Sequence, residues 1–195
     1  PISKLVVATN KNDILKRVVN TGHYKPSKVE QTVSPSMDIQ VSSNFERLLF
    51  DYYDRDGKTI AAMLENFRIN KEVNFGSDRW QAMRSLFEGY SVKEVDVDSA
   101  IAGIYKTTGE LLDPHSIIGV VAGQQGHVDP ADTMIALATA HPAKFPDTVT
   151  KAAGIKPELP SHLTDLFDRN EKLSELPNDI NQVRKYINDR CLVRP

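Results

Sequence analysis

The sequence lacks several features that would assign it to a special class of protein. One of its 195 residues is cysteine, Cys191, so no disulfide can form within the chain. Its 24 Lys and Arg residues nearly balance its 26 Asp and Glu residues, which gives no electrostatic reason to expect nucleic acid or an anionic membrane as a partner. No apolar run approaches the ~20 residues that a membrane-spanning helix requires. We therefore expect a globular protein of the reducing cytoplasm, without nucleic-acid or membrane partners.

Recognisable metal and nucleophile motifs are missing as well. No group of His, Cys and acidic residues has the spacing of metal ligands, and Ser, His and Asp occur without a nucleophile elbow. We find no internal repeat or low-complexity tract. A hydrophobic content of 40% and a charged content of 26% are ordinary for a single domain with a real core.

The first part of the chain has the pattern of a strand followed by a helix. Leu5 to Ala8 form a continuous apolar run, which is typical of a strand buried on both faces of a parallel sheet. Asn10 or Asn12 is expected to cap the next helix, with Asp13 in its first turn and Gly22 as its end. This arrangement is half of a βαβ unit and indicates the α/β class.

Most of the middle of the chain has helical periodicity. The segment 58–67 carries apolar residues on one face, 78–88 is expected to end at Gly89, and a third helix starts at Asp96 or Asp98 and ends at Gly109. A short strand is expected within 90–95. The run 74–77 contains one glycine and follows no strong strand, so it predicts a plain helix cap at Ser77 and not a phosphate-binding loop.

Two later segments place polar residues where ligands commonly bind. Asp113 followed by Pro114 is a strong helix start, and His115 then lies in the first turn, pointing out of the helix N-terminus. The apolar residues 134–138 predict a buried strand. Thr139 and His141 follow in a polar turn at the end of that strand, where ligands bind in open α/β sheets. A helix is expected over 146–153, with its end at Gly154.

The stretch TVSPSMDIQVSSNFERLLFD, residues 32–51, is the most unusual part of the sequence. Its first half is dense in short polar side chains, which satisfy backbone or ligand groups, so it looks like a segment laid along a site. Ser43 and Glu46 have the spacing of a capping box. Arg47 can serve a ligand or can pair with Asp51 one turn later.

The order of residues in this stretch closely resembles the SP-x-MD…SNFERLLF signature of threonine synthases. Three further stretches resemble motifs of that family, in the same order along the chain: the ATN-x-ND motif at 8–13, the Asp-Pro-His motif at 113–115 and the TAHPAKF motif at 139–145. Threonine synthases are pyridoxal-phosphate enzymes that convert O-phosphohomoserine to threonine and phosphate. The chain thus resembles the C-terminal portion of such an enzyme over nearly all of its length.

The resemblance implies a fold and a domain organisation. The expected fold is α/β, the C-terminal part of a pyridoxal-phosphate enzyme of fold type II, the tryptophan synthase β-like family, helix-rich with a few buried parallel strands. Residues 1–154 would form part of the cofactor-binding large domain, and residues 155–195 a helical extension packed on it. The N-terminal half of the enzyme would then be the missing partner of this chain.

The resemblance also implies site residues. Thr139 would face the pyridine nitrogen of the cofactor, where a neutral hydroxyl moderates the electron sink. His141 and Asn10 would complete the cofactor side. The predicted substrate-binding residues are Ser34, Ser36, Asp38, Asn44, Arg47, His115 and Lys144. No catalytic residue is expected here, because the lysine that bonds to the cofactor and the loop that holds its phosphate have no match in this sequence.

Two other functions remain open from the sequence. The chain could be a catalytically inactive fragment or paralogue that serves as an interaction module. It could also belong to another pyridoxal-phosphate lyase of the same fold, such as a relative of threonine dehydratase.

Overall fold

A computed structural model describes residues 2–126, 129 and 131–191 of the chain. It divides the chain into two compact units, Pro1–Glu158 and Leu159–Pro195. Each unit is described by itself.

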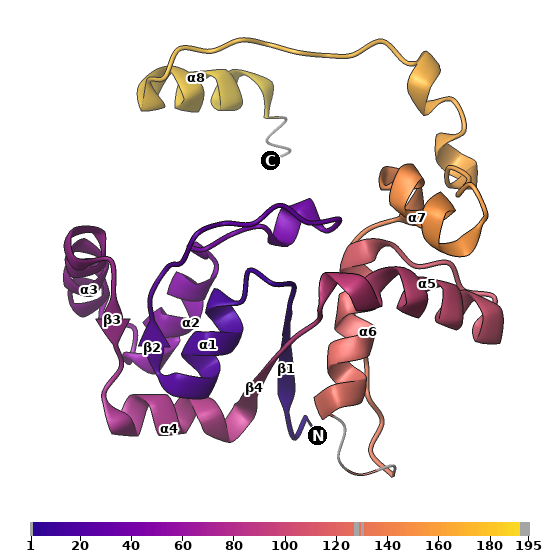
Figure 1. Cartoon of the computed structure of the whole chain (residues 1–195). Helices are drawn as coiled ribbons and strands as arrows, with labels where there is room; N and C mark the ends of the chain where they lie inside the picture. Colours follow the sequence, from indigo (N-terminus) through magenta and orange to yellow (C-terminus); the bar gives the residue numbers. More distant parts are fainter. Residues whose placement is uncertain (1, 127–128, 130, 192–195) are drawn as a thin grey trace. The chain divides into compact units, whose positions relative to one another are not determined.

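The first unit is built on a pair of parallel strands with a helix against each face. β1 (Leu5–Thr9) pairs in parallel with β4 (Phe87–Ser91), with Val7 opposite Gly89. Val7 contacts the apolar cluster that contains α1 (Ile14–Thr21), whereas Val6 and Ala8 contact the cluster that contains α6 (Pro114–Gly126). Figure 1 shows β1 between these two helices. The predicted α/β class is confirmed.

The expectation that β1 is buried on both faces is only half right. Both faces carry a helix, but Val6, Val7 and Ala8 remain half-buried and Leu5 is 37% exposed. The physical reason is that β4 is the one strand paired with β1 among the residues that the structure describes, so the other edge of β1 is uncovered.

The first unit also contains a second pair of strands and several further helices and 3-10 turns. β2 (His23–Tyr24) and β3 (Val73–Asn74) form a small antiparallel pair. The other helices and 3-10 turns, in chain order, are η1 (Pro35–Met37), α2 (Phe45–Tyr52), α3 (Gly57–Asn70), α4 (Ser77–Leu86), α5 (Glu94–Thr108), η2 (Pro142–Lys144) and α7 (Pro146–Ala153). The predicted helix ends at Gly22, Gly109 and Gly154 are confirmed, and each of these glycines has the left-handed conformation.

Several predicted helix starts are wrong. Asp13, not Asn10 or Asn12, is the N-cap of α1, and α5 begins at Glu94, before both predicted aspartates. The expected capping box of α2 does not form: between Ser43 and Glu46 the structure has only the backbone bond from Glu46 N to Ser43 O, 3.2 Å. Ser77 is the first residue of α4, after Gly76 as N-cap, and makes no side-chain cap bond.

Gly89 does not end a helix, because it lies inside β4. α4 stops at Leu86 and the chain enters the strand directly. Gly89 is instead the point where α1 crosses the sheet: a Cβ there would lie 2.7 Å from the Cα of Lys16. The side-chain amide of Asn20 in α1 also donates to Gly89 O at 2.8 Å and accepts from Gly89 N at 3.2 Å.

We expect Gly89→Ala to lower the free energy of unfolding by about 1–3 kcal/mol, because the new methyl group forces α1 away from β4. Gly103→Ala in α5 is the matched control, since a Cβ at this exposed glycine meets no atom within 4 Å. That variant should gain about 0.5–1 kcal/mol as a better helix former. Urea unfolding followed by the fluorescence of Trp80 measures both, and equal stability of the two variants would contradict the proposed crossing.

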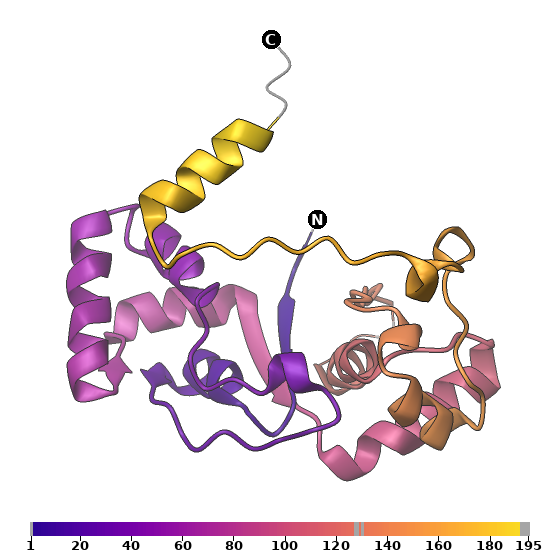
Figure 2. The ribbon, with the colours of Figure 1, turned by 90° about the horizontal axis from the view of Figure 1, so that it is seen from above.

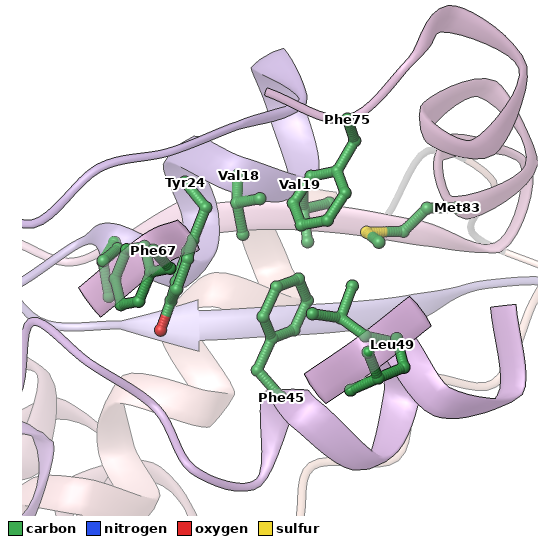
Figure 3. Close-up of a cluster of buried hydrophobic side chains, with 10 residues drawn as sticks. Val18, Val19, Tyr24, Phe45, Leu49, Phe67, Phe75 and Met83 are labelled. Carbon is green, nitrogen blue, oxygen red and sulfur yellow. The ribbon is translucent and has the colours of Figure 1, made fainter. Parts of the chain in front are cut away.

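Two apolar clusters form the core of the first unit. The first joins α1, α2, α3 and α4 around an aromatic group (Figure 3), in which Tyr24 lies 4.8 Å from Phe67 and 5.2 Å from Phe45, between ring centroids. The second cluster joins α5 and α6, where Ile101, Ile117 and Ile118 are fully buried.

The second unit is small. It contains the 3-10 turns η3 (Ser161–Leu163) and η4 (Leu166–Asp168), then an extended link to α8 (Ile180–Arg190), which Figure 2 shows from above. Phe167, which lies in η4, is 84% exposed. The packing of residues 155–195 on the first unit stays a prediction. None of the described helices has the length and apolarity to cross a bilayer.

Candidate functional site

The end of β1 is the centre of a buried polar network. Asn10 is 1% exposed, and its Nδ2 lies 2.8 Å from Thr32 Oγ1, 3.0 Å from Ser34 Oγ and 2.8 Å from Asp38 Oδ1. Its Oδ1 accepts a hydrogen bond from the backbone N–H of Asn12. A single amide thus holds both ends of residues 32–38, which we call the 32–38 loop.

Asp38 collects donors from the same network. Its Oδ1 accepts from Thr32 Oγ1 at 2.7 Å and from Asn12 Nδ2 at 3.0 Å, and its Oδ2 accepts from Thr32 N at 2.9 Å. Asn12 also exchanges two hydrogen bonds with the backbone of Glu30. Asn10 and Asn12 fail to cap α1 because these tertiary partners compete successfully for their amides.

His115 links this loop to the start of α6. Its Nε2 lies 3.2 Å from the backbone N of Ser36, its Nδ1 lies 2.7 Å from Asp113 Oδ2, and its ring centroid is 4.5 Å from that of Phe145. With 8% of its surface exposed, His115 does not point out of the helix into solvent, as its sequence position suggested. The ring of His115 lies inward because the carboxylate of Asp113 turns it back onto the loop.

Asp113 caps α6 as predicted. It is fully buried, and it accepts from the backbone N–H groups of His115 at 3.0 Å and of Ser116 at 2.9 Å. Burial raises the pKa of Asp113, but the hydrogen bonds from Ser116 and His115 outweigh burial and hold the pKa below its ordinary value.

A folded-state pKa below the unfolded value makes Asp113 stabilising above its unfolded-state pKa of about 3.9, and this stabilisation is lost as the pH falls through the folded pKa. We therefore expect the stability difference between the native chain and Asp113→Asn to shrink as the pH is lowered from about 5 to 3. Asp189→Asn, which alters an exposed carboxylate, is the control and should show little change. Urea unfolding at a series of pH values measures this stability difference. A difference that stays constant with pH would contradict a lowered pKa of Asp113 in the folded state.

Thr139 lies at the same end of α6. Its backbone N–H donates to Ser116 Oγ at 3.0 Å, and its side chain is exposed. The strand predicted over 134–138 is wrong, since the structure assigns neither strand nor helix there and leaves Ile135 78% and Leu137 76% exposed. Residues 134–138 form no strand because the described part of the chain offers no neighbouring strand to take up their backbone hydrogen bonds.

The other predicted site residues divide into two groups. His141 caps η2 by accepting from Ala143 N at 3.2 Å, and Lys144 lies exposed in the same turn, near the network. Asn44 and Arg47 are exposed at the start of α2 and make none of the bonds of the network. The pairing of Arg47 with Asp51 is wrong, because Asp51 instead accepts from Arg55 at 3.0 Å.

Sequence reasoning missed several members of the network. Thr32, Asn12 and Ser116 were not predicted as site residues, and neither was Glu94, whose Oε1 accepts from the backbone N–H of Val33 at 2.8 Å. The polar density of residues 30–38 was a signal that this segment needs many partners. A cavity of about 220 Å³ lies elsewhere, among aromatic residues of α2, α3 and β2, and none of the predicted site residues lines it.

Solved structures with the same α/β fold include enzymes named threonine synthase. Over 97% of its length, the chain matches the crystal structure of pyridoxal-phosphate-bound threonine synthase from Brucella melitensis, with a TM-score of 0.81 and 41% identity, and it covers 40% of that protein. Yeast threonine synthase matches with a TM-score of 0.77 and 32% identity, with 42% of that protein covered. The Escherichia coli enzyme, at 24% identity and a TM-score of 0.64, shares the fold.

Sequence comparisons point to the same enzymes. Residues 116–187 match the family model "Threonine synthase, C-terminal". The chain is 44% identical over 188 residues to threonine synthase of Pseudomonas aeruginosa and 35% identical over 198 residues to that of Corynebacterium glutamicum. These matches cover 96% and 97% of the chain but 40% of each relative. Over nearly all of its own length, the chain is thus similar to threonine synthases, and residues 116–187 are similar to their C-terminal part.

Proposed function

We propose that this chain is the C-terminal part of a pyridoxal-phosphate-dependent threonine synthase. The whole enzyme would convert O-phospho-L-homoserine and water to L-threonine and phosphate. One observation supports this most strongly: the four motifs, which lie far apart in the sequence, meet around one polar network. Asn10 bonds to Ser34 and Asp38, Ser36 bonds to His115, and Ser116 bonds to Thr139.

The residues at Thr139 fit the ring of the proposed cofactor. The backbone of Thr139 is held by Ser116, and its exposed hydroxyl has no hydrogen-bond partner among the residues that the structure describes. It is therefore available as a neutral partner for a ring nitrogen. His141 lies in the same turn, and Asn10 fixes the loop opposite. When bound, the pyridine ring would withdraw electrons from the reacting carbons of the substrate.

The substrate side needs groups for a phosphate and a carboxylate. Lys144 in η2 and Arg47 in α2 are exposed cations without an ion pair in the described ranges, and Ser36 and Asn44 add polar groups. Both ring nitrogens of His115 are engaged by Ser36 and Asp113, so His115 would serve the substrate through the loop. We propose that Lys144 and Arg47 attract the anionic substrate, since cations suit both of its charged ends. Ser34 and Asp38 are occupied within the network, so they would serve the substrate by fixing the shape of the loop.

The remainder of the proposed enzyme would have a place on this chain. A Cβ at Gly126 would lie 3.2 Å from Val6, and one at Gly123 would lie 3.1 Å from Met134, so β1 and the segment 133–139 both begin beside the C-terminal end of α6. β1 and the segment 133–139 both run toward the N-terminal end of α6, where Asn10 and Thr139 join the network. Two parallel segments on one helix, each with an uncovered edge, favour the insertion of further strands between them.

We infer that the N-terminal half of the enzyme supplies those strands. The chain spans about 40% of the length of its relatives, and in our proposal the cofactor-binding lysine and the phosphate loop would lie in the remainder. The complete enzyme would have fold type II and act in the cytoplasm. Residues 1–154 would complete its large domain, with residues 155–195 as a helical extension packed on it.

A chimera tests the proposal. The region of the Pseudomonas aeruginosa enzyme that matches this chain is replaced by residues 1–195, and phosphate release from O-phosphohomoserine is assayed together with growth of a threonine auxotroph. Threonine synthesis supports the proposal. A folded chimera that binds pyridoxal phosphate without activity would favour the inactive paralogue, and one that deaminates threonine would favour a dehydratase.

Within that chimera, we expect Thr139→Ala to lower kcat about 5- to 30-fold while cofactor binding persists. Loss of one hydrogen bond to the ring nitrogen should raise the barrier by about 1–2 kcal/mol. Thr139→Ser is the control, because it keeps the hydroxyl and should stay within a fewfold of the parent. Steady-state kinetics and the cofactor absorption band measure the two effects, and unchanged turnover in Thr139→Ala removes the assignment.

A further inference from the structure

The contacts of His115 define its protonation state. Ser36 N is a donor, so Nε2 of His115, 3.2 Å away, must be the unprotonated nitrogen of the ring. The ring proton then lies on Nδ1, where it donates to Asp113 Oδ2 at 2.7 Å. Asp113 is itself held by two backbone N–H groups at the start of α6, so the orientation of the ring is determined by the helix.

The same ring contacts three separate parts of the site. Its Nε2 holds the 32–38 loop through Ser36, its Nδ1 is fixed to α6, and its ring lies tilted against that of Phe145, the residue after Lys144. Asp113 is the charged group in contact with the ring among the described residues. Asp38 and Glu94 hold the same loop from its other side, through Thr32 and Val33.

We propose that His115 is a positioning residue, whose neutral, Asp113-oriented imidazole sets the distance between the 32–38 loop and the segment that carries Thr139 and Lys144. This inference rests on the proposed function for its effect on turnover, but the local geometry stands without it. Protonation of Nε2 replaces the acceptor by a donor and releases Ser36 N. His115 therefore acts on the substrate through Ser36 and the loop, and its loss should raise KM more than it lowers kcat.

The first test uses the chain itself and is independent of activity. In ¹⁵N NMR spectra at neutral pH, His115 should show the tautomer protonated on Nδ1, and the amide resonance of Ser36 should shift with the same midpoint as the titration of His115. Asp113→Asn should weaken the preference for that tautomer. A ring protonated on Nε2 at neutral pH, or a Ser36 amide that ignores the titration, overturns the proposal even if the chimera makes threonine.

The second test uses a matched pair of substitutions. His115→Gln places a side-chain oxygen near the position of Nε2, whereas His115→Phe keeps a ring against Phe145 but has no acceptor. In the active chimera, His115→Phe should raise KM about tenfold with kcat within about threefold, and amide exchange at Ser36 should be about tenfold faster. His115→Gln should restore both toward the parent values.

The result that contradicts the positioning role is an equal effect of the two variants on KM and on Ser36 exchange. Fluorescence of Trp80, whose indole N–H donates to Val19 O at 2.9 Å, checks that each variant is folded. If the chimera makes no threonine, the exchange rates in the chain alone still decide whether His115 holds Ser36. Failure of the proposed function and failure of this inference are thus separate outcomes.

Discussion

The chain alone should release no phosphate from O-phosphohomoserine and should develop no absorption band of covalently bound pyridoxal phosphate. The cofactor requires an amine for a covalent bond, an amide-lined loop for its phosphate and a partner for its ring nitrogen. In our proposal only the last of these, the hydroxyl of Thr139, belongs to this chain. We therefore expect phosphate release and the cofactor band in an active chimera and neither of them in the chain alone.

Uncovered surface on the chain supports the expectation that the chain alone is inactive. The uncovered edge of β1 and the exposed apolar residues Ile135 and Leu137 cost about 25 cal/mol for each Å² of apolar surface left in water. We expect the chain to self-associate or to bind a partner segment through this surface. The measurement mixes the purified chain with pyridoxal phosphate, records the spectrum and assays phosphate. A stoichiometric band together with turnover would show that a lysine of this chain serves the cofactor, and would contradict our assignment of the missing half.

The largest effect on stability is expected for Phe45→Ala, which should lower the free energy of unfolding by about 3–5 kcal/mol. Phe45 is 6% exposed, and its ring centroid lies 5.2 Å from that of Tyr24 and 6.1 Å from that of Phe75. Figure 3 shows these rings together in the cluster. Truncation removes apolar burial and aromatic contacts together and leaves a hole beside α2, which relaxes only in part.

Phe50→Ala makes the same chemical change in the same helix and is the matched control. Phe50 is 37% exposed, so its loss should cost less than half as much. Urea unfolding followed by the fluorescence of Trp80, which packs against the same cluster, measures both variants. Equal destabilisation by the two substitutions would show that the aromatic group is not the core of this unit.

Local sequence signals determined the parts of this protein that depend on residues close together in the chain. The end of α1 at Gly22, the bounds of α7, and the start of α6 at Asp113 followed by Pro114 were all predictable. A left-handed glycine, a capping carboxylate and a proline at the first helical position act within one turn of the helix. The order of the motifs was likewise sufficient to identify the family, because it is a property of the sequence itself.

The tertiary structure alone decided where side chains had a choice of partners. Asn10 can cap a helix or bind a loop, and it binds the 32–38 loop because Thr32, Ser34 and Asp38 offer more hydrogen bonds there than one helix end does. Gly89 resembles a helix stop by composition, but the close approach of Lys16 in α1 is what excludes a side chain at that position. Residues 134–138 have the composition of a strand, yet a strand exists only where a neighbouring strand takes up its backbone hydrogen bonds. Composition is local, whereas the competition among distant partners is settled only when the chain has folded.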